Sequence, residues 1–434
     1  MRIENRFYLD QMKELLKEDY DRLVASFDEP LYKSLRVNPL KGEKKLIASE
    51  IALGEPVPFD EDTYYLEDEQ KPGKHPFHLA GLYYLQEPSA TMAVNALDVR
   101  EGDVVLDLCG APGGKSTQIL SRLNNTGFLF SNEYDRKRAN VLLSNLERWG
   151  AGNYLLTNST VENLCPQLRG VCDKVLVDAP CSGSGMFRKY PESVADYTEG
   201  NVRACARRQL AILEQAAQTV KSGGTLVYST CTFSRQEDED VVEVFLKEHP
   251  DFELTDSGLS CGQPGFDERR LSRRAFPWQG GEGHFVARMI RTSEVAAVKL
   301  RQLNYGHDKK VDGFLKEVGR EDLKYTIINE RVYVSLQPLY DLKASILRQG
   351  ILLGELVKGR LEPHHHFFIS FTGLKNTCEI ADAEDVSRYL RGESLFMDVP
   401  KGYVQITYRG VPIGFGKSDG SQIKNRLPKG LRTV

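Results

Sequence analysis

The chain has 434 residues, of which 41% are hydrophobic and 27% charged, and its formal net charge is −4. This length predicts two or three domains, and the composition is that of a folded, water-soluble protein rather than a disordered or fibrous one. No apolar run reaches the roughly 18 residues that a membrane span needs, and the first residues lack the apolar core of a signal peptide. We therefore expect a cytoplasmic protein that does not contact membranes.

The eight cysteines form no CxxC pair, so neither a zinc ribbon nor a disulfide framework is expected. The charge is uneven, because residues 1–300 carry a net charge of −9 and residues 301–434 a net charge of +5. The last 34 residues hold seven basic groups against Asp419 alone. Such an end suits contact with phosphate, and it is equally consistent with a solvated terminus.

Apolar residues recur at helical spacing over residues 8–27, which predicts one or two amphipathic helices. Six prolines between residues 30 and 76 then interrupt the chain. This punctuation predicts a small, loop-rich N-terminal module over residues 1–75.

From about residue 89 to 290, short β-branched runs alternate with helical stretches, which is typical of a parallel sheet built from βα units. The pattern predicts an α/β core over residues 76–293, with helices at Asp135–Trp149 and Val202–Val220 and strands at Val104–Leu108, Gly127–Asn132, Tyr154–Thr157, Lys174–Val177, Thr225–Ser229 and Phe285–Ile290.

The remaining residues, 294–434, are interpreted as a small α+β region in one or two subdomains. Hydrophobic helices are expected within Leu342–Lys358. Strands are expected at Tyr403–Tyr408 and Val411–Gly416, with glycines near their turns.

A glycine-rich turn follows the first core strand in the string VVLDLCGAPGGKST, residues 104–117. Glycine lets backbone amides approach a ligand closely because it has no side chain to hold the ligand off. One candidate ligand is a nucleotide phosphate, since the string fits the P-loop pattern GxxxxGK[ST] except at Cys109, which replaces the first glycine. The later VLVD, residues 175–178, resembles the Walker B strand of such proteins.

The rival ligand is S-adenosyl-L-methionine in a Rossmann-like methyltransferase. In such enzymes, an acidic residue at the end of the next strand accepts hydrogen bonds from both ribose hydroxyls of the cofactor. Glu133, which comes 26 residues after Asp107, is the candidate for this residue. In a third interpretation, Gly113 and Gly114 only form a tight turn between strand and helix and bind no ligand. Glu133 and the sequence strings that follow it argue against this interpretation.

Two cysteines follow predicted strands at the ligand-binding edge of the sheet: Cys181 in VDAPCSGSGMFRK (residues 177–189) and Cys231 in YSTCTFSRQEDED (residues 228–240). A thiolate that adds to carbon 6 of cytosine breaks the aromaticity of the ring, so that carbon 5 can attack a sulfonium methyl group. Lys115 offers a cation that favours the thiolate, and Asp178 can hydrogen-bond nitrogen 3 or the amino group of the base.

Together, the strings LRVNPLK, YLQEPSA, DLCGAPGGKS, DAPCSGSGMFRK and YSTCTFSRQEDE resemble the Nop/Sun family of RNA cytosine-5 methyltransferases over about residues 30–290. The rest of the chain looks like the bacterial subgroup that methylates small-subunit ribosomal RNA and carries a PUA-like RNA-binding region. The resemblance implies a Rossmann-like class I methyltransferase core, an RNA-binding N-terminal module and C-terminal region, S-adenosylmethionine as cofactor, ribosomal RNA or the small ribosomal subunit as partner, and a monomer.

The resemblance also implies roles for single residues. Cys231 would attack carbon 6, Cys181 would assist release of the product, and Asp178 would contact both the cofactor and the base. The other cofactor contacts that it implies are Cys109, Gly110, Ala111, Pro112, Gly113, Gly114, Lys115 and Glu133. The chain departs from the family after the third strand, where LLTNSTVEN offers Asn158 or Thr160 instead of the usual acidic residue near the adenine.

Two other functions compete with this one. A P-loop nucleotidase or kinase would bind ATP with magnesium, and a non-catalytic RNA-binding or ribosome-assembly protein would use the basic end without transferring a methyl group. No metal site is expected at EPHHHFF, residues 362–368, because adjacent histidines point in different directions and no further ligand is suitably spaced.

Overall fold

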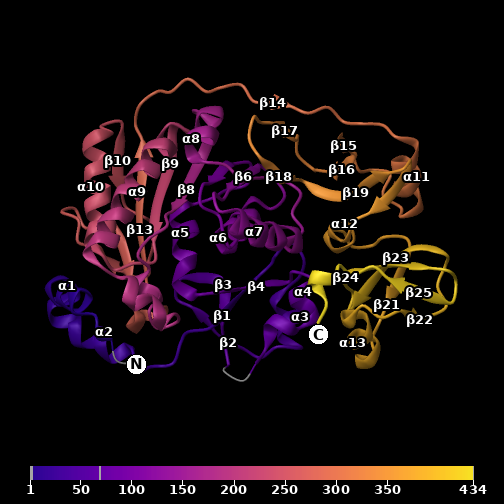
Figure 1. Cartoon of the computed structure of the whole chain (residues 1–434), viewed down its shortest axis with the longest axis horizontal. Helices are drawn as coiled ribbons and strands as arrows, with labels where there is room; N and C mark the ends of the chain where they lie inside the picture. Colours follow the sequence, from indigo (N-terminus) through magenta and orange to yellow (C-terminus); the bar gives the residue numbers. More distant parts are fainter. Residues whose placement is uncertain (1–2, 68–69, 434) are drawn as a thin grey trace.

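The computed structural model describes residues 3–67 and 70–433. Figure 1 shows the two N-terminal helices at the lower left, the central sheet through the left and middle, and the C-terminal region, orange to yellow, at the right. The segment that joins the core to the C-terminal region crosses the top of this view. Among the described residues, no helix has the length and apolar character that a membrane crossing requires.

The chain begins with helices α1 (Arg6–Leu16) and α2 (Tyr20–Ser26), which confirms the prediction from helical spacing. Their apolar face buries Tyr8, Met12 and Leu23. The Tyr8 ring packs edge-on against Phe187 and Tyr197, with centroid distances of 5.1 and 5.3 Å. The first helix therefore rests on the loop that follows one of the core strands.

An antiparallel sheet with the order β2-β3-β1-β4 follows these helices. Its elements are β1 (Ser34–Val37), α3 (Lys44–Ala48), β2 (Leu53–Val57), β3 (Asp60–Leu66), α4 (Pro76–Leu79) and β4 (Tyr83–Gln86). Because β4 pairs with β1, this sheet extends beyond residue 75.

The core is a sheet with the order β11-β12-β13-β9-β8-β5-β6-β7-β18, and β10 also pairs with β13. Strands β5 to β9 are parallel and β13 is antiparallel to β9. The strand bounds are β5 Val104–Asp107, β6 Phe128–Asn132, β7 Tyr154–Thr157, β8 Cys172–Asp178, β9 Val220–Thr230, β10 Phe252–Thr255, β11 Gln263–Pro264, β12 Arg273–Ala275 and β13 His284–Arg291. All six predicted core strands are confirmed.

Helices cover both faces of this sheet, as a parallel sheet with buried strands requires. They are α5 (Met92–Leu97), α6 (Gly114–Leu123), α7 (Arg136–Trp149), α8 (Val161–Leu164), α9 (Glu199–Ala217) and α10 (Glu239–Glu248). Strand β5 has β6 on one side and β8 on the other, so the strand order reverses there. In doubly wound sheets, ligands bind beyond the carboxyl ends of the strands at such a switch point.

The C-terminal region contains two further sheets, with orders β15-β16-β19-β20 and β21-β23-β24-β25-β22, and a short pair β14-β17. Their bounds are β14 Arg301–Gln302, α11 Lys309–Glu317, β15 Tyr325–Ile328, β16 Arg331–Val334, β17 Tyr340–Asp341, β19 Ile351–Val357, β20 Arg360–Pro363, α12 His365–Ser370, β21 Thr377–Glu379, α13 Ala383–Arg391, β22 Leu395–Phe396, β23 Gly402–Tyr408, β24 Val411–Ser418 and β25 Gln422–Asn425. The strands predicted at 403–408 and 411–416 are confirmed.

The helices predicted within residues 342–358 are wrong. The segment forms β18 (Ile346–Gln349), which pairs antiparallel with β7 of the core sheet, and β19, which belongs to the next sheet. Gly350 separates them with a φ of 59°, in the left-handed region. The apolar run ILL is buried in a strand, and a run this short cannot be distinguished from a buried helix by its periodicity.

Candidate active site

A cavity of about 980 Å³ opens at the carboxyl edge of the core sheet, at the switch point. Its wall is built from the turn after β5, the ends of β6, β8 and β9, and residues 160–162 after β7. Eight of the residues singled out in the sequence line it: Cys109, Ala111, Pro112, Glu133, Thr160, Asp178, Cys181 and Cys231. Gly110, Gly113, Gly114, Lys115 and Asn158 are not among its lining residues, although Lys115 Nζ reaches Asp178 of the wall at 2.9 Å.

The turn between β5 and α6 needs glycine at two positions. A Cβ atom on Gly110 would lie 2.6 Å from Ser131 Oγ, and Gly113 has a φ of 118°. The Gly110 amide donates to the carbonyl of Asn132 at 2.8 Å, which ties the turn to the end of β6. The glycines therefore fit the turn against the sheet and bring the backbone of Cys109–Pro112 to the cavity wall.

Arg36 of β1 supports the same turn from the N-terminal sheet. Its buried guanidinium donates to the Gly114 carbonyl at 2.8 Å and to Thr117 Oγ1 at 2.7 Å, and it lies over the Trp149 ring at 5.0 Å. The N-terminal sheet is thus part of the structure that shapes the cavity.

The two cysteines meet at the cavity. Cys181 Sγ lies 3.4 Å from Cys231 Sγ. The hydrogen bond to Cys231, together with burial, raises the pKa of the Cys181 thiol well above its usual value. Cys181 therefore keeps its proton and can donate it in a hydrogen bond to the sulfur of Cys231.

Asp178 is the charged centre beside this pair. Its carboxylate accepts from Lys115 Nζ and from Ser229 Oγ, each at 2.9 Å. Burial alone would raise the pKa of Asp178, but the Lys115 cation and these two hydrogen bonds outweigh burial and lower it. Asp178 is therefore an ionised hydrogen-bond acceptor at neutral pH.

His284 of β13 is a buried neighbour of Asp178. Its Nε2 atom lies 3.7 Å from Asp178 Oδ1, and within the described residues neither ring nitrogen has a hydrogen-bond partner. Burial and the nearby Lys115 cation lower the pKa of His284 to about 3, so the imidazole is neutral.

Glu237 holds together the loops that carry the two cysteines. Its buried carboxylate accepts from the Ser182 amide at 2.9 Å, from the Ser182 hydroxyl, and from Gln209 Nε2 at 3.0 Å. Thr232 Oγ1 lies 2.9 Å from both Ser182 Oγ and Ser184 Oγ. The loop after β8 is thereby fixed to the loop after β9.

At the other end of the cavity, the Glu133 carboxylate is buried. One oxygen accepts from the Asp135 amide at 2.9 Å, while Oε2 has no hydrogen-bond partner in the described part of the chain and lies 3.6 Å from Arg138 Nη1. Asn158 donates its side-chain amide to the carbonyls of Glu133 and Tyr134, each at 2.7 Å. Asn158 therefore orders this loop, whereas Thr160 reaches the cavity wall.

Sequence reasoning did not find Ser229, Glu237 or His284. Ser229 and Glu237 lie in the string that contains Cys231, but no spacing rule links them to it. His284 comes from an antiparallel strand whose pairing with β9 is visible only in the fold. The P-loop interpretation also loses its basis, because Lys115 Nζ is bound to Asp178 and β13 lies antiparallel in the sheet.

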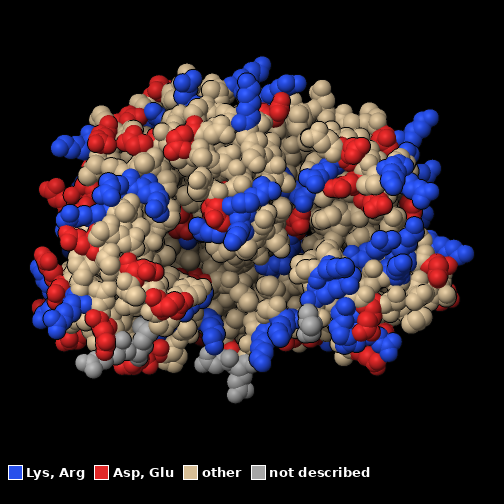
Figure 2. Space-filling view, in the orientation of Figure 1, with Lys and Arg blue, Asp and Glu red and all other residues tan. Residues whose placement is uncertain are grey.

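On the face shown in Figure 2, a group of Lys and Arg side chains lies at the right, where Figure 1 places the C-terminal strands β23 and β25, and further basic side chains are scattered over the rest of this face. Within residues 3–67 and 70–433, no group of three or more His, Cys, Asp or Glu is arranged to hold a metal ion.

Three parts of the chain match known families. Residues 94–290 match 16S rRNA methyltransferase RsmB/F, residues 5–88 match the N-terminal domain of 16S rRNA methyltransferase RsmF, and residues 376–433 match the methyltransferase RsmF PUA domain. The ribosomal RNA small subunit methyltransferase F of Shewanella piezotolerans is 31% identical over 98% of this chain and 96% of its own length. That of Erwinia tasmaniensis is 30% identical over 98% and 96%, respectively.

Solved structures show the same core. A methyltransferase homolog protein from Pyrococcus horikoshii has a TM-score of 0.59 at 28% identity and covers 67% of this chain and 98% of its own. NSun6 from Pyrococcus horikoshii, solved with SFG, has a TM-score of 0.60 at 21% identity, covering 68% and 100%. The core is a Rossmann-like methyltransferase fold.

Proposed function

The chain belongs to the RsmB/F family of 16S ribosomal RNA methyltransferases, and we propose that it transfers a methyl group from S-adenosylmethionine to carbon 5 of a cytidine in that RNA. The observation that carries the proposal is the pair of thiols, 3.4 Å apart, at the end of neighbouring strands and beside the ionised Asp178. Pyrimidine carbon 5 requires such a nucleophile because it is unreactive until carbon 6 is attacked.

The cavity fits S-adenosylmethionine, which supplies an electrophilic methyl group when bound. The buried Glu133 Oε2, which has no hydrogen-bond partner among the described residues, suits a ribose hydroxyl. The backbone of Cys109–Pro112 would lie along the methionine portion, and Thr160 would lie near the adenine. These contacts support the cofactor assignment from the donor atoms that the cavity offers.

The side chains also suit the target base. As a carboxylate, Asp178 can accept a hydrogen bond from the cytosine amino group, and the Lys115 ammonium, bound to Asp178, can donate to nitrogen 3. Hydrogen bonding at nitrogen 3 draws electrons from the ring as Cys231, after losing its thiol proton to water, forms a bond from its thiolate sulfur to carbon 6. Carbon 5 would then use the displaced electron pair to take the methyl group, whose bond to the sulfonium sulfur of the donor would break with its electron pair left on that sulfur.

Release reverses the addition. The carbon 5 proton passes to water in the cavity, its bonding pair re-forms the double bond between carbons 5 and 6, and Cys231 leaves as a thiolate. Cys181, which keeps its proton, can donate a hydrogen bond to that thiolate across the 3.4 Å between the sulfur atoms. This donation stabilises the leaving group and accounts for a second cysteine.

The test uses unmethylated 16S ribosomal RNA and tritiated S-adenosylmethionine. Cys231→Ala should transfer no label, whereas Cys181→Ala should accumulate a covalent protein–RNA adduct that survives a denaturing gel. Cys261→Ala, which removes a cysteine outside the cavity, is the matched control and should retain activity. Full turnover by Cys231→Ala would overturn the proposal, and bisulfite sequencing of the RNA identifies the modified cytidine.

A further inference from the structure

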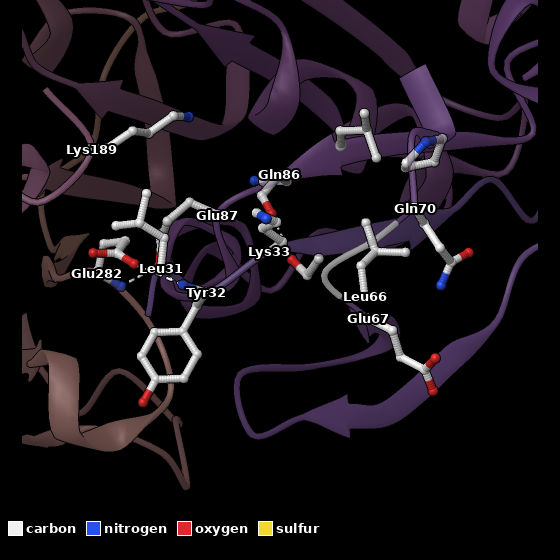
Figure 3. A pocket seen from close by; sticks show the side chains of 13 residues that line it. Leu31, Tyr32, Lys33, Leu66, Glu67, Gln70, Gln86, Glu87, Lys189 and Glu282 are labelled. Carbon is white, nitrogen blue, oxygen red and sulfur yellow. Dashed lines mark hydrogen bonds between the residues drawn. The ribbon is translucent and has the colours of Figure 1, made fainter. Parts of the chain in front are cut away.

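A second cavity, of about 290 Å³, lies where the N-terminal sheet meets the loops of the methyltransferase core. Figure 3 shows Leu31, Tyr32, Lys189 and Glu282 on one side of it and Leu66, Glu67 and Gln70 on the other, with Gln86 between. Leu31 and Tyr32 come from the segment before β1, whereas Lys189 and Glu282 belong to the core. The cavity therefore exists only because the two parts of the chain are packed together.

The second cavity adjoins the active-site cavity through two consecutive residues. Lys189 lines the second cavity, and Tyr190 lines the active-site cavity. Lys189 and Tyr190 lie at the end of the loop that starts at Cys181. The Lys189 ammonium lies 5.4 Å from the centre of the Tyr190 ring. An RNA whose target nucleotide occupies the active-site cavity would therefore have a neighbouring nucleotide close to the second cavity, because consecutive residues line the two cavities.

Three carboxylates line the second cavity, and the two on the side of Lys189, those of Glu87 and Glu282, are already engaged, whereas Glu67 lies on the opposite side (Figure 3). Glu87 accepts from the amides of Ser89 at 2.9 Å, Ala90 at 2.8 Å and Glu282 at 2.6 Å. Glu282 accepts from the Tyr32 amide at 3.0 Å and lies 3.4 Å from Arg188 Nη1. With these acidic groups held by protein donors, the Lys189 cation is available to an anion between the two cavities.

The wall chemistry matches a nucleobase. Leu31, Leu66 and Leu85 offer apolar surfaces for the faces of a flat ring. Gln86 Oε1 already accepts from Arg36 Nε at 3.2 Å, which leaves Gln86 Nε2 as a donor to the edge of the ring. Proteins bind unstacked RNA bases in this way, by stacking on aromatic and apolar side chains and by hydrogen bonds to the base edges. The volume is at the small end of the roughly 300–1,000 Å³ of ligand pockets, which suits a single base.

We propose that this second cavity holds the base of a nucleotide adjoining the target cytidine, and that Lys189 contacts the phosphate that joins them. The proposal rests on the proposed function, because it takes the target cytidine to lie beside Cys181 and Cys231. The N-terminal module would thereby contribute to substrate specificity, because it would recognise the nucleotide next to the target cytidine in the RNA.

A base bound in the second cavity would also affect the loop that begins at Cys181. Arg188 Nη2 donates to the carbonyls of Glu29 at 3.0 Å and Pro30 at 2.6 Å, so the segment that carries Leu31 and Tyr32 is bound to the residue before Lys189. A base that packs against Leu31 would therefore restrain this segment and, through Arg188, the loop that begins at Cys181.

The test compares Leu31→Trp, which fills the cavity, and Lys189→Gln, which removes the cation, with the exposed control Lys247→Gln on α10. Leu31 is 37% exposed and lies outside regular structure, so the larger side chain does not disturb the core. We expect both variants to raise the KM for unmethylated 16S RNA about tenfold or more, with S-adenosylmethionine affinity unchanged, as the loss of one stacked base would. The control should keep the parental KM.

A second measurement locates the base directly. RNA with 4-thiouridine on either side of the target cytidine is irradiated with the parent protein, and the crosslinked peptides are identified by mass spectrometry. Crosslinks to residues 31–34 or 85–87 that Leu31→Trp abolishes would support the proposal. If the parent forms 5-methylcytosine while both variants keep its KM and crosslinks fall elsewhere, the cavity assignment fails and the proposed function stands. If the parent forms no 5-methylcytosine, the proposed function itself fails.

Discussion

Cys181 Sγ lies 3.4 Å from Cys231 Sγ, although 50 residues separate the two in the sequence. The closeness follows from strand register, because β8 and β9 are parallel neighbours in which Asp178 is paired with Ser229. Cys181 comes three residues after the end of β8 and Cys231 directly after the end of β9, so the two loops emerge side by side at the carboxyl edge of the sheet. Glu237 and Thr232 then fix the loops to each other.

This closeness predicts that a mild oxidant will join the two cysteines. Diamide would take two electrons and two protons from the thiols and leave a disulfide, which removes the nucleophile. We expect most methyl transfer to be lost, the number of free thiols to fall by two per chain, and dithiothreitol to restore both. The measurements are a methyl-transfer assay and thiol titration. Cys181→Ala is the control, because it lacks one of the two cysteines and should not form this disulfide or lose two thiols. Inactivation of the parent without a loss of thiols would contradict the prediction.

Replacing Lys115 by methionine should shift the acid limb of the activity profile. Without the Lys115 cation, burial is left to raise the pKa of the Asp178 carboxyl, whose pKa is lowered in the parent. A protonated Asp178 cannot accept from the cytosine amino group at a pH where the parent can. We expect kcat/KM to fall about 100-fold or more near pH 7 and its acid limb to move to higher pH. The profile is measured between pH 5 and 9, with the exposed Lys137→Met as control; an unmoved acid limb would count against this role.

Much of the core could be predicted from the sequence because buried parallel strands leave continuous apolar runs. Val104–Leu108 and Tyr154–Thr157 are of this kind, and the residues that directly follow such strands reach the ligand edge whatever their side-chain conformation. This is why Asp178, Cys181 and Cys231 could be named before any geometry was known. The resemblance to a family then ordered the roles of the two cysteines.

Other parts depend on contacts that no local pattern contains. His284 reaches Asp178 only because β13 is inserted antiparallel beside β9, and Glu237 reaches Ser182 only because two loops meet. The strand Ile346–Gln349 joins the core sheet at β7 from far along the chain, and the apolar run that follows it belongs to β19, so no local pattern distinguishes this segment from a helix. Asn158 has a residue type suited to adenine, but its amide is consumed by the carbonyls of Glu133 and Tyr134.

Glu237→Gln should impair catalysis without impairing cofactor binding. The amide that replaces the carboxylate presents a donor where Ser182 and Gln209 also donate, so one of those buried groups loses its acceptor. Such a loss costs about 1–3 kcal/mol of unfolding free energy and loosens the loop that carries Cys181. We expect kcat to fall about tenfold and the Kd for S-adenosylmethionine to stay within about twofold. Calorimetry, steady-state kinetics and urea unfolding measure the three quantities. Glu243→Gln, on the exposed face of α10, is the control, and a large change in cofactor affinity would show that Glu237 acts elsewhere.

The buried carboxyl group of Asp107 should make the stability of the protein depend on pH. Its carboxyl is fully buried, Ser116 donates to one oxygen at 2.6 Å, and the other has no hydrogen-bond partner among the described residues. Burial, together with the nearby Asp178 and Glu133, raises the pKa of Asp107 to about 7, despite the opposing Ser116 hydrogen bond and Lys115 cation. In the unfolded chain the same group ionises near pH 4.

Between about pH 4 and 7 the unfolded state therefore loses this proton while the folded state keeps it, so stability falls as the pH rises through that window. Asp107→Asn removes the titration and keeps an oxygen for Ser116. We expect the unfolding free energy of the variant, relative to the parent, to increase by about 2 kcal/mol between pH 5 and pH 8. Urea unfolding at both pH values measures the change, and Asp21→Asn, exposed on α2, is the control that should show none. A difference that is the same at both pH values would mean that Asp107 is already ionised at pH 5, which would contradict the raised pKa.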